Sequence, residues 1–112
     1  MEVFNLTTGN TLAENAWLAA DFFSRLRGLL GTKQLADGEG LVIRPCSSIH
    51  TFGMNYPIDV VFADAAGKVT LTAASLGPGR MLMCRGSSFV VELPTGTLAQ
   101  SGTTAGDYLR LD

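Results

Sequence analysis

The chain has 112 residues, of which 46% are hydrophobic and 16% charged, and its formal net charge at pH 7 is −2. This composition excludes an intrinsically disordered chain, and the slightly negative charge argues against a protein that binds the phosphate backbone of nucleic acid. The length is typical of one domain, so we expect residues 1–112 to fold as a single domain with its own core.

The N-terminal segment has no basic stretch followed by an apolar stretch. The sequence therefore indicates no signal peptide and favours a cytoplasmic location. The longest apolar runs, such as residues 60–63, are far shorter than the roughly 18 residues of a membrane-spanning helix, so we expect no membrane insertion. Cys46 and Cys84 are too few for a disulfide scaffold. We expect two free, partly buried thiols, the alternatives being a single bridge or a reactive Cys46.

In chain order, residues 2–8 are predicted to form a strand that ends at Gly9, whereas residues 11–20 fit neither the helical nor the strand period. Residues 21–30 give the clearest helix, with Asp21 as its N-cap and Gly31 just past its end. One apolar stripe follows the helical spacing in this segment: Phe22, Phe23, Leu26, Leu29 and Leu30.

The second half of the chain is dominated by short strands. Residues 58–63 and 68–73 are joined by a turn at 64–67 and are predicted to form a β-hairpin. Further strands are expected at 40–43, 88–93 and 108–111, with a short helix at 95–101. Because no strand–helix–strand alternation is present, the pattern predicts a mainly β (α+β) domain. We expect a small, mostly antiparallel β-sandwich or partly open barrel with one or two short helices.

Several different short motifs follow one another along the chain in a characteristic order. They are Arg27-Gly28-Leu29-Leu30-Gly31, Gly40-Leu41-Val42-Ile43, Phe52-Gly53-Met54, Pro57-Ile58-Asp59-Val60-Val61-Phe62-Ala63-Asp64, Gly67-Lys68-Val69, Val91-Glu92-Leu93 and Gly106-Asp107. This set resembles the family called Domain of Unknown Function 192, which comprises small bacterial and archaeal proteins. The resemblance covers residues 20–110 and implies a compact, mainly β domain, but it implies no biochemical function, since none is established for the family.

The chain also departs from the common pattern of that family. Many members have Trp between the Phe and the Met, where this chain has Gly53, and many have a longer stretch before the Pro that corresponds to Pro57. Many also carry a signal peptide. The segment His50-Thr51-Phe52-Gly53-Met54 therefore resembles a separate branch, to which ligands of the secreted members need not apply.

Residues 46–54 are the densest polar segment in an otherwise apolar chain, and they contain its single histidine. In an extended strand Cys46 and His50 would lie about 13 Å apart, too far to share a ligand. On one helical turn, begun by Pro45 and ended by Gly53, they would be neighbours. The sequence leaves both geometries open.

The simplest interpretation of this segment is structural, with Met54 and Phe52 in the core and His50 hydrogen-bonded to backbone or to a carboxylate. Among functional interpretations, the leading one is a non-enzymatic accessory domain that binds an unknown small molecule or protein, without a cofactor, as a monomer or homodimer. Its groove would be formed by His50, Thr51, Phe52 and Met54, with Arg27 and Arg44 at the rim.

Two other functions remain open at this point. A small hydrolase or thiol enzyme would use Cys46 or Ser48 as the nucleophile, His50 as its base and Asp59 to orient the base, although no nucleophile elbow or protease signature supports it. A soft-metal protein would bind an ion such as Cu(I) through Cys46, His50 and Met54.

Two acidic residues, Asp59 and Glu92, lie within apolar predicted strands. A buried carboxylate needs a partner, so we expect structural ion pairs with arginines such as Arg27, Arg44 or Arg85. The alternative is a pair of acids that act together in catalysis.

Overall fold

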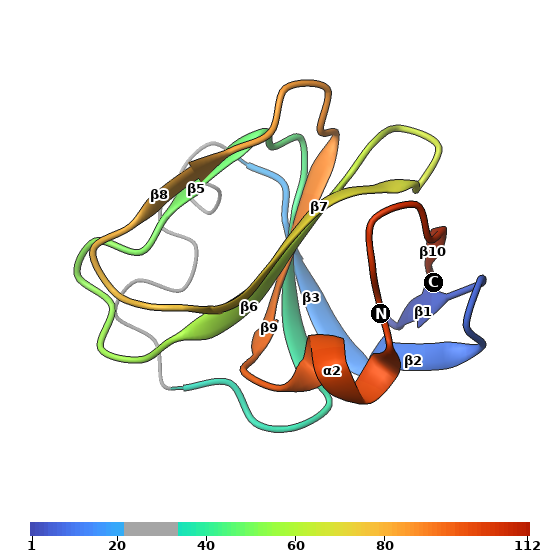
Figure 1. Ribbon diagram of the computed structural model, residues 1–112, viewed down its shortest axis with the longest axis horizontal. Coiled ribbons are helices and arrows are strands. Elements are labelled where there is room, and N and C mark those ends of the chain that lie inside the picture. The colour runs from blue at the N-terminus through green and yellow to red at the C-terminus, as the bar shows by residue number, and fades with distance from the viewer. Residues whose placement is uncertain (22–33) are drawn as a thin grey trace.

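The computed structural model describes residues 1–21 and 34–112 (Figure 1). The predicted helix at 21–30 lies outside the described residues, apart from Asp21. The elements are β1 (Val3–Asn5), β2 (Asn10–Ala13), β3 (Asn15–Ala19), β4 (Glu39–Ile43), β5 (Ser48–His50), β6 (Ile58–Ala63), β7 (Val69–Leu76), β8 (Met81–Met83), β9 (Phe89–Pro94), α2 (Thr97–Ser101) and β10 (Leu109–Leu111). The described strands form three sheets, ordered β3-β4-β9-β6-β7, β10-β1-β2 and β5-β8.

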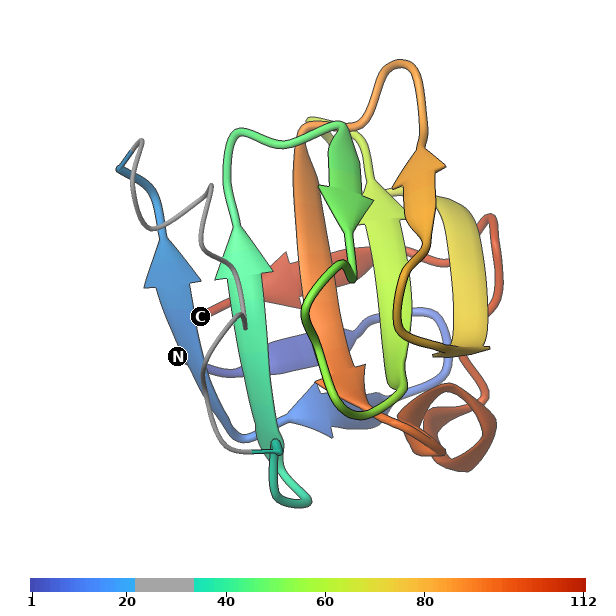
Figure 2. The same cartoon turned by 90° about the vertical axis from the view of Figure 1, so that its left-hand side faces the viewer.

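The five-stranded sheet is covered on both of its faces. Figure 2 shows β1, β2 and β10 crossing behind it, while β5 and β8 stand in front of it as a two-stranded ribbon. Every residue of β6 and β9 is buried. Both strands therefore have near-continuous apolar sequences, because a strand that is buried on both faces needs no polar alternation.

Two separate cores result from this arrangement. Val61, Val91 and Leu93 pack on the side of β1, β2 and β10. Val60 and Val90 point to the opposite face and pack on the side of β5 and β8. The five-stranded sheet thus divides the molecule into two halves.

The sheet of β1, β2 and β10 is closed at one end by a buried polar network. The Nδ2 of Asn5 donates hydrogen bonds to Thr103 Oγ1 (3.1 Å) and Asp107 Oδ2 (3.0 Å). The Asn5 amide and the backbone N–H of Thr104 hold the pKa of Asp107 below its usual value. Both ends of the chain meet in this sheet, where the backbone N–H of Asp112 donates to the carbonyl of Glu2 (2.9 Å).

The mainly β, mostly antiparallel expectation is confirmed, and none of the described sheets closes into a barrel. The 58–63 and 68–73 hairpin is present as β6 and β7, although β7 continues to Leu76. The short helix predicted at 95–101 is α2, which ends at Gly102 in the left-handed conformation. The ambiguous residues 11–20 form β2 and β3, and β3 pairs with β4 in parallel.

The described parts of the chain contain no helix that is long and apolar enough to cross a membrane.

Candidate functional site

The segment 46–54 is extended around β5 rather than helical. It begins after a cis peptide bond between Arg44 and Pro45 and pairs with β8 in antiparallel register. In β5 the side chain of Ile49 points into the core, so those of Ser48 and His50 point outward. Of the two geometries that the sequence allowed, the structure contains the extended one.

Thr51 is fully buried and holds the loop before β8 against the end of β5. Its hydroxyl donates to the carbonyl of Gly77 (2.7 Å) and accepts from the backbone N–H of Arg80 (2.9 Å). Its carbonyl accepts from the N–H of Gly79 (3.1 Å). The predicted ligand-binding residue Thr51 therefore supports the loop, and its hydroxyl is not presented to solvent.

The three residues predicted as soft-metal ligands, Cys46, His50 and Met54, are divided between the core and the surface. Met54 is buried in the core beneath the ribbon, as the structural interpretation expected. The thiol of Cys46 donates to the carbonyl of Ser48 (3.0 Å) and packs against the same core. His50 points to the outer face of β5, so Met54 and His50 do not present their side chains to a common space.

The imidazole ring of His50 has an aromatic neighbour and a buried nitrogen. Its ring stacks on that of Phe52, with ring centroids 5.4 Å apart and an interplanar angle of 23°. The Nδ1 atom is buried and lacks a partner among the described residues. Phe52 is 49% exposed, so its predicted place in the core is wrong.

Two methionines that the sequence analysis did not single out complete this face. Met81 lies directly opposite His50 in the β5–β8 pairing, and Met83 lies opposite Ser48. They are 62% and 70% exposed, while Leu82 between them points into the core. The alternation Met-Leu-Met was a weak signal for a strand of three residues, and only the non-local pairing with β5 places these methionines beside His50.

We call the outward surface formed by His50, Phe52, Met81 and Met83 the ribbon face. Arg44, predicted at the rim of the site, is exposed beyond the end of β4. Arg27, the other predicted rim residue, lies outside the described residues.

Asp59 lies on the other side of the five-stranded sheet from the ribbon face. Its Oδ1 accepts from the N–H of Ser75 (2.8 Å), and its Oδ2 accepts from the N–H groups of Gly96 (3.1 Å) and Leu98 (2.9 Å). The carboxylate thus caps α2 and holds Ser75, whose φ is 49°. The ion pair predicted for Asp59 is absent from the described residues, where backbone N–H groups satisfy this carboxylate in place of an arginine.

Glu92 is buried on the same side of the sheet as the ribbon, between Leu41 of β4 and Val60 of β6. Its Oε1 has no hydrogen-bond partner within the described parts of the chain. Desolvation by burial raises the pKa of Glu92 to about 7. The predicted ion pair of Glu92 is also absent from the described residues, where the ion pair observed joins Arg110 to Asp112. Asp59 and Glu92 point to opposite faces of the sheet and do not form a catalytic pair.

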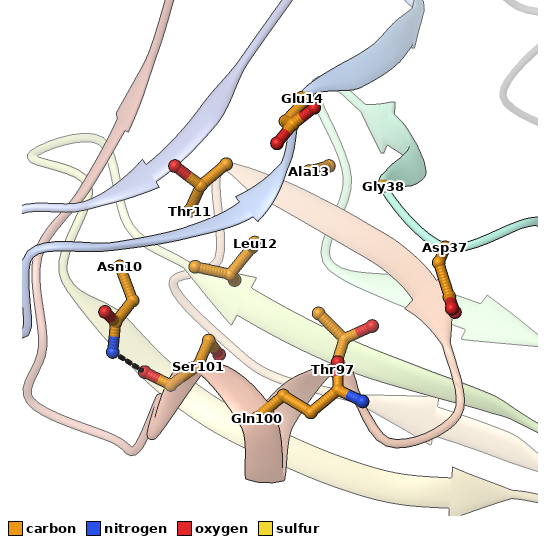
Figure 3. Close-up of a pocket in the computed structure, with 10 residues that line it drawn as sticks. All are labelled: Asn10, Thr11, Leu12, Ala13, Glu14, Asp37, Gly38, Thr97, Gln100 and Ser101. Carbon is orange, nitrogen blue, oxygen red and sulfur yellow. Dashed lines mark hydrogen bonds between the residues drawn. The ribbon is translucent and has the colours of Figure 1, made fainter.

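A cavity of about 310 Å³ lies away from the ribbon face, between β2, α2 and the loop before β4 (Figure 3). Its lining is mostly polar: Asn10, Thr11, Leu12, Ala13, Glu14, Asp37, Gly38, Thr97, Gln100 and Ser101. Within it the Asn10 side chain donates to the carbonyl of Ser101 (3.0 Å). The residues that line this cavity include no histidine or cysteine.

These features define a small, mainly β domain in which an exposed aromatic and thioether face lies across a sheet from a polar cavity. The DUF192 family model ("Uncharacterized ACR") matches residues 4–111, and the chain belongs to this family. The resemblance inferred from the motifs is thereby confirmed. The family has no established function, and no enzymatic activity is shown for it.

The similar proteins are described in equally general terms. A "UPF0127 protein" from Thermococcus sibiricus is 28% identical over 112 residues, which are 96% of this chain and 72% of the relative. A crystal structure of a protein of unknown function from Novosphingobium aromaticivorans matches with a TM-score of 0.83 and 22% identity, covering 98% of this chain and 82% of that one. A "putative transcription regulator" from Sinorhizobium meliloti matches with a TM-score of 0.82 and 22% identity, over 97% and 89% of the two chains. At this identity the two structures show the fold alone.

Proposed function

We propose that the chain is a non-enzymatic binding protein and that its ligand contacts the ribbon face. The observation that carries this proposal is the cluster of His50, Phe52, Met81 and Met83 on one outward surface of β5 and β8. Apolar side chains that are exposed singly need no explanation, but an aromatic ring and two methionines gathered around an imidazole are typical of a binding surface.

The arrangement of the other candidates argues against the hydrolase and thiol-enzyme hypotheses. A base must be within hydrogen-bond reach of the proton that it removes, and a third group must orient it. Asp59 cannot orient His50, because the five-stranded sheet lies between them and three backbone N–H groups already occupy its carboxylate. The Cys46 thiol donates its proton to a carbonyl, which is no base.

The experiment that tests the proposal is NMR titration of ¹⁵N-labelled protein with a panel of amino acids, short peptides and metal ions. We expect amide shifts to concentrate on β5 and β8 for at least one class of ligand. The variant His50→Ala should weaken that binding, whereas Gln100→Ala, which changes the polar cavity, should leave it unchanged. Shifts that concentrate on the cavity residues, or equal binding by wild type and His50→Ala, would contradict the proposal.

A further inference from the structure

We propose that the ribbon face binds one soft monovalent cation, Cu(I) or Ag(I), through the imidazole of His50 and the thioether sulfurs of Met81 and Met83. This inference rests on the proposed function, because it names the class of ligand for the same face. It replaces the set Cys46, His50 and Met54 considered from the sequence with a set drawn from two paired strands.

The register of the ribbon places the three side chains together. His50 and Met81 are direct partners, and Met83 lies two residues further along the same face of β8. In an antiparallel pair, opposite Cβ atoms are about 4.5–5.5 Å apart and diagonal neighbours about 7–8 Å apart. Methionine has three rotatable bonds, so both sulfurs can turn toward an ion beside the imidazole without a change in the backbone.

The type of ligand atom selects the ion. Thioether sulfur is a soft ligand that favours Cu(I), and imidazole nitrogen is compatible with it. All three ligands are neutral, so the site supplies none of the carboxylate oxygens that Mg²⁺ or Ca²⁺ requires. Within residues 1–21 and 34–112, no cluster of three or more His, Cys, Asp or Glu side chains offers an alternative metal site.

His50 provides an independent observation that points to a ligand. Its buried Nδ1 has no hydrogen-bond partner among the described residues, and the stacked ring of Phe52 sets the plane of the imidazole. The imidazole is therefore oriented by an aromatic contact, and no hydrogen bond within the described parts of the chain occupies its Nδ1 atom. A cation held at this position also lies near an aromatic ring, whose face attracts positive charge.

The two thiols are a competing soft site and must be separated from the ribbon face. Both are half-buried and pack against the core beneath the ribbon, and the Sγ of Cys84 lies 3.3 Å from the hydroxyl of Thr70. Because thiolates bind Ag(I) strongly, uptake of metal alone does not test the proposal. The test needs a signal that comes from the thioethers.

The first experiment is an Ag(I) titration of protein labelled with ¹³C at the methionine ε-methyl groups. Ag(I) is used because it is a soft ion that does not change oxidation state in the assay. The chain has four methionines. We expect the methyl signals of Met81 and Met83 to shift together and to saturate with one equivalent of Ag(I). The signals of Met1 and of the buried Met54 should not move. Ag(I) uptake without any shift of the Met81 and Met83 signals would overturn the proposal.

The second experiment measures affinity by competition for Ag(I) in a Cys46→Ser, Cys84→Ser background. We expect the double variant Met81→Leu, Met83→Leu to bind roughly 100-fold more weakly, since even the outer-shell partners of metal ligands are worth 10- to 100-fold. The matched control Met54→Leu removes a thioether from the core and should bind as the background does. Equal affinity in the Met81→Leu, Met83→Leu variant would refute the assignment.

Folding does not obscure the result, because Met81 and Met83 are exposed and their replacement by Leu should leave the melting temperature unchanged. The two proposals also fail differently. In one outcome, Ag(I) leaves the thioether signals unchanged while another class of ligand shifts the amide signals of β5 and β8. That result would refute the metal inference and support the proposed binding face. If no ligand shifts the amide signals of β5 and β8, both proposals are refuted.

Discussion

At the scale of single residues, Asp59 connects three segments that are distant in the sequence. Its carboxylate accepts hydrogen bonds from backbone N–H groups of β7 and of the start of α2. Because side chains alternate along a strand, Asp59 faces away from Ile58 and Val60, but this alternation does not reveal what lies on that face. The sequence pointed to arginine because charge is visible in a sequence, whereas the N–H groups of a distant helix are not.

The substitution Asp59→Asn should therefore destabilise the protein without affecting the ribbon face. An amide keeps one acceptor and directs its NH₂ group at backbone donors, so we expect a loss of about 2–4 kcal/mol in the free energy of unfolding. Urea denaturation measures it. Asp64→Asn is the matched control, because the Asp64 carboxylate also accepts backbone N–H groups, in the exposed turn before β7. A cost for Asp59→Asn no larger than for Asp64→Asn would show that the capping role is overstated.

Glu92 makes the stability of the protein depend on pH near neutrality. Burial raises its pKa from 4.5 to about 7 in the folded state. Between these two pH values the folded protein retains a proton that the unfolded chain has released. Stability contributed by the protonated form is therefore present at low pH, falls as the pH rises from 4.5 to 7, and stays low above 7.

Replacing Glu92 with Gln should remove this dependence, since the amide has a similar shape and no charge. At pH 8 we expect Glu92→Gln to be more stable than wild type by about 3 kcal/mol, which corresponds to the pKa shift at 1.36 kcal/mol per unit. Chemical denaturation of both proteins from pH 5 to pH 8 gives the difference directly. A difference that does not grow with pH would be inconsistent with a buried, protonated Glu92.

At the scale of elements, local sequence predicted β4, β6, β7 and β9 of the central sheet, and it missed β3 and both strands of the ribbon. The hairpin of β6 and β7 has apolar alternation and a glycine turn close together in the chain, so local rules suffice. The strands β5 and β8 have three residues each and are separated by thirty residues. Their pairing is set by the burial of Ile49 and Leu82, which a short window of sequence does not reveal. The predicted site was therefore half complete, because Met81 and Met83 come from the missed strand.

The turn between β6 and β7 also carries a contact with β10. Gly67 has a φ of 86°, and a Cβ built there would lie 2.5 Å from the carbonyl oxygen of Leu109. Gly67→Ala should cost about 2–5 kcal/mol, because the left-handed backbone penalty adds to the displacement of β10. Gly79→Ala has a similar φ of 75° with open space around it, and it should cost only about 1–2 kcal/mol. Thermal unfolding of the two variants compares them, and equal losses would contradict the role of the Leu109 contact.

At the scale of the whole molecule, the central sheet and the ribbon should differ in stability. The strands β6 and β9 lie in the interior of the five-stranded sheet, with every residue buried. The ribbon is a two-stranded sheet, which is marginal without support and is held here by packing on one core. The mainly β class was predictable from the sequence because it depends on composition and turn spacing, but this difference between layers depends on topology.

Hydrogen exchange should resolve the two layers. We expect amides of β9 to exchange only through global unfolding, and those of β5 and β8 to exchange through local openings that cost at least about 2 kcal/mol less. Native-state exchange followed by NMR gives the opening free energies. Indistinguishable values for β9 and the ribbon would mean that the molecule opens as one unit.

The meeting of residues 2 and 112 in one sheet has a practical consequence. Both ends leave the fold beside β1 and β10, across the five-stranded sheet from β5 and β8. A biotin tag or a tether attached at either end would therefore hold the protein to a sensor surface by the side that carries β1 and β10. The methionines of the ribbon would face the flowing solution, so surface-based binding assays can use either terminus without masking them.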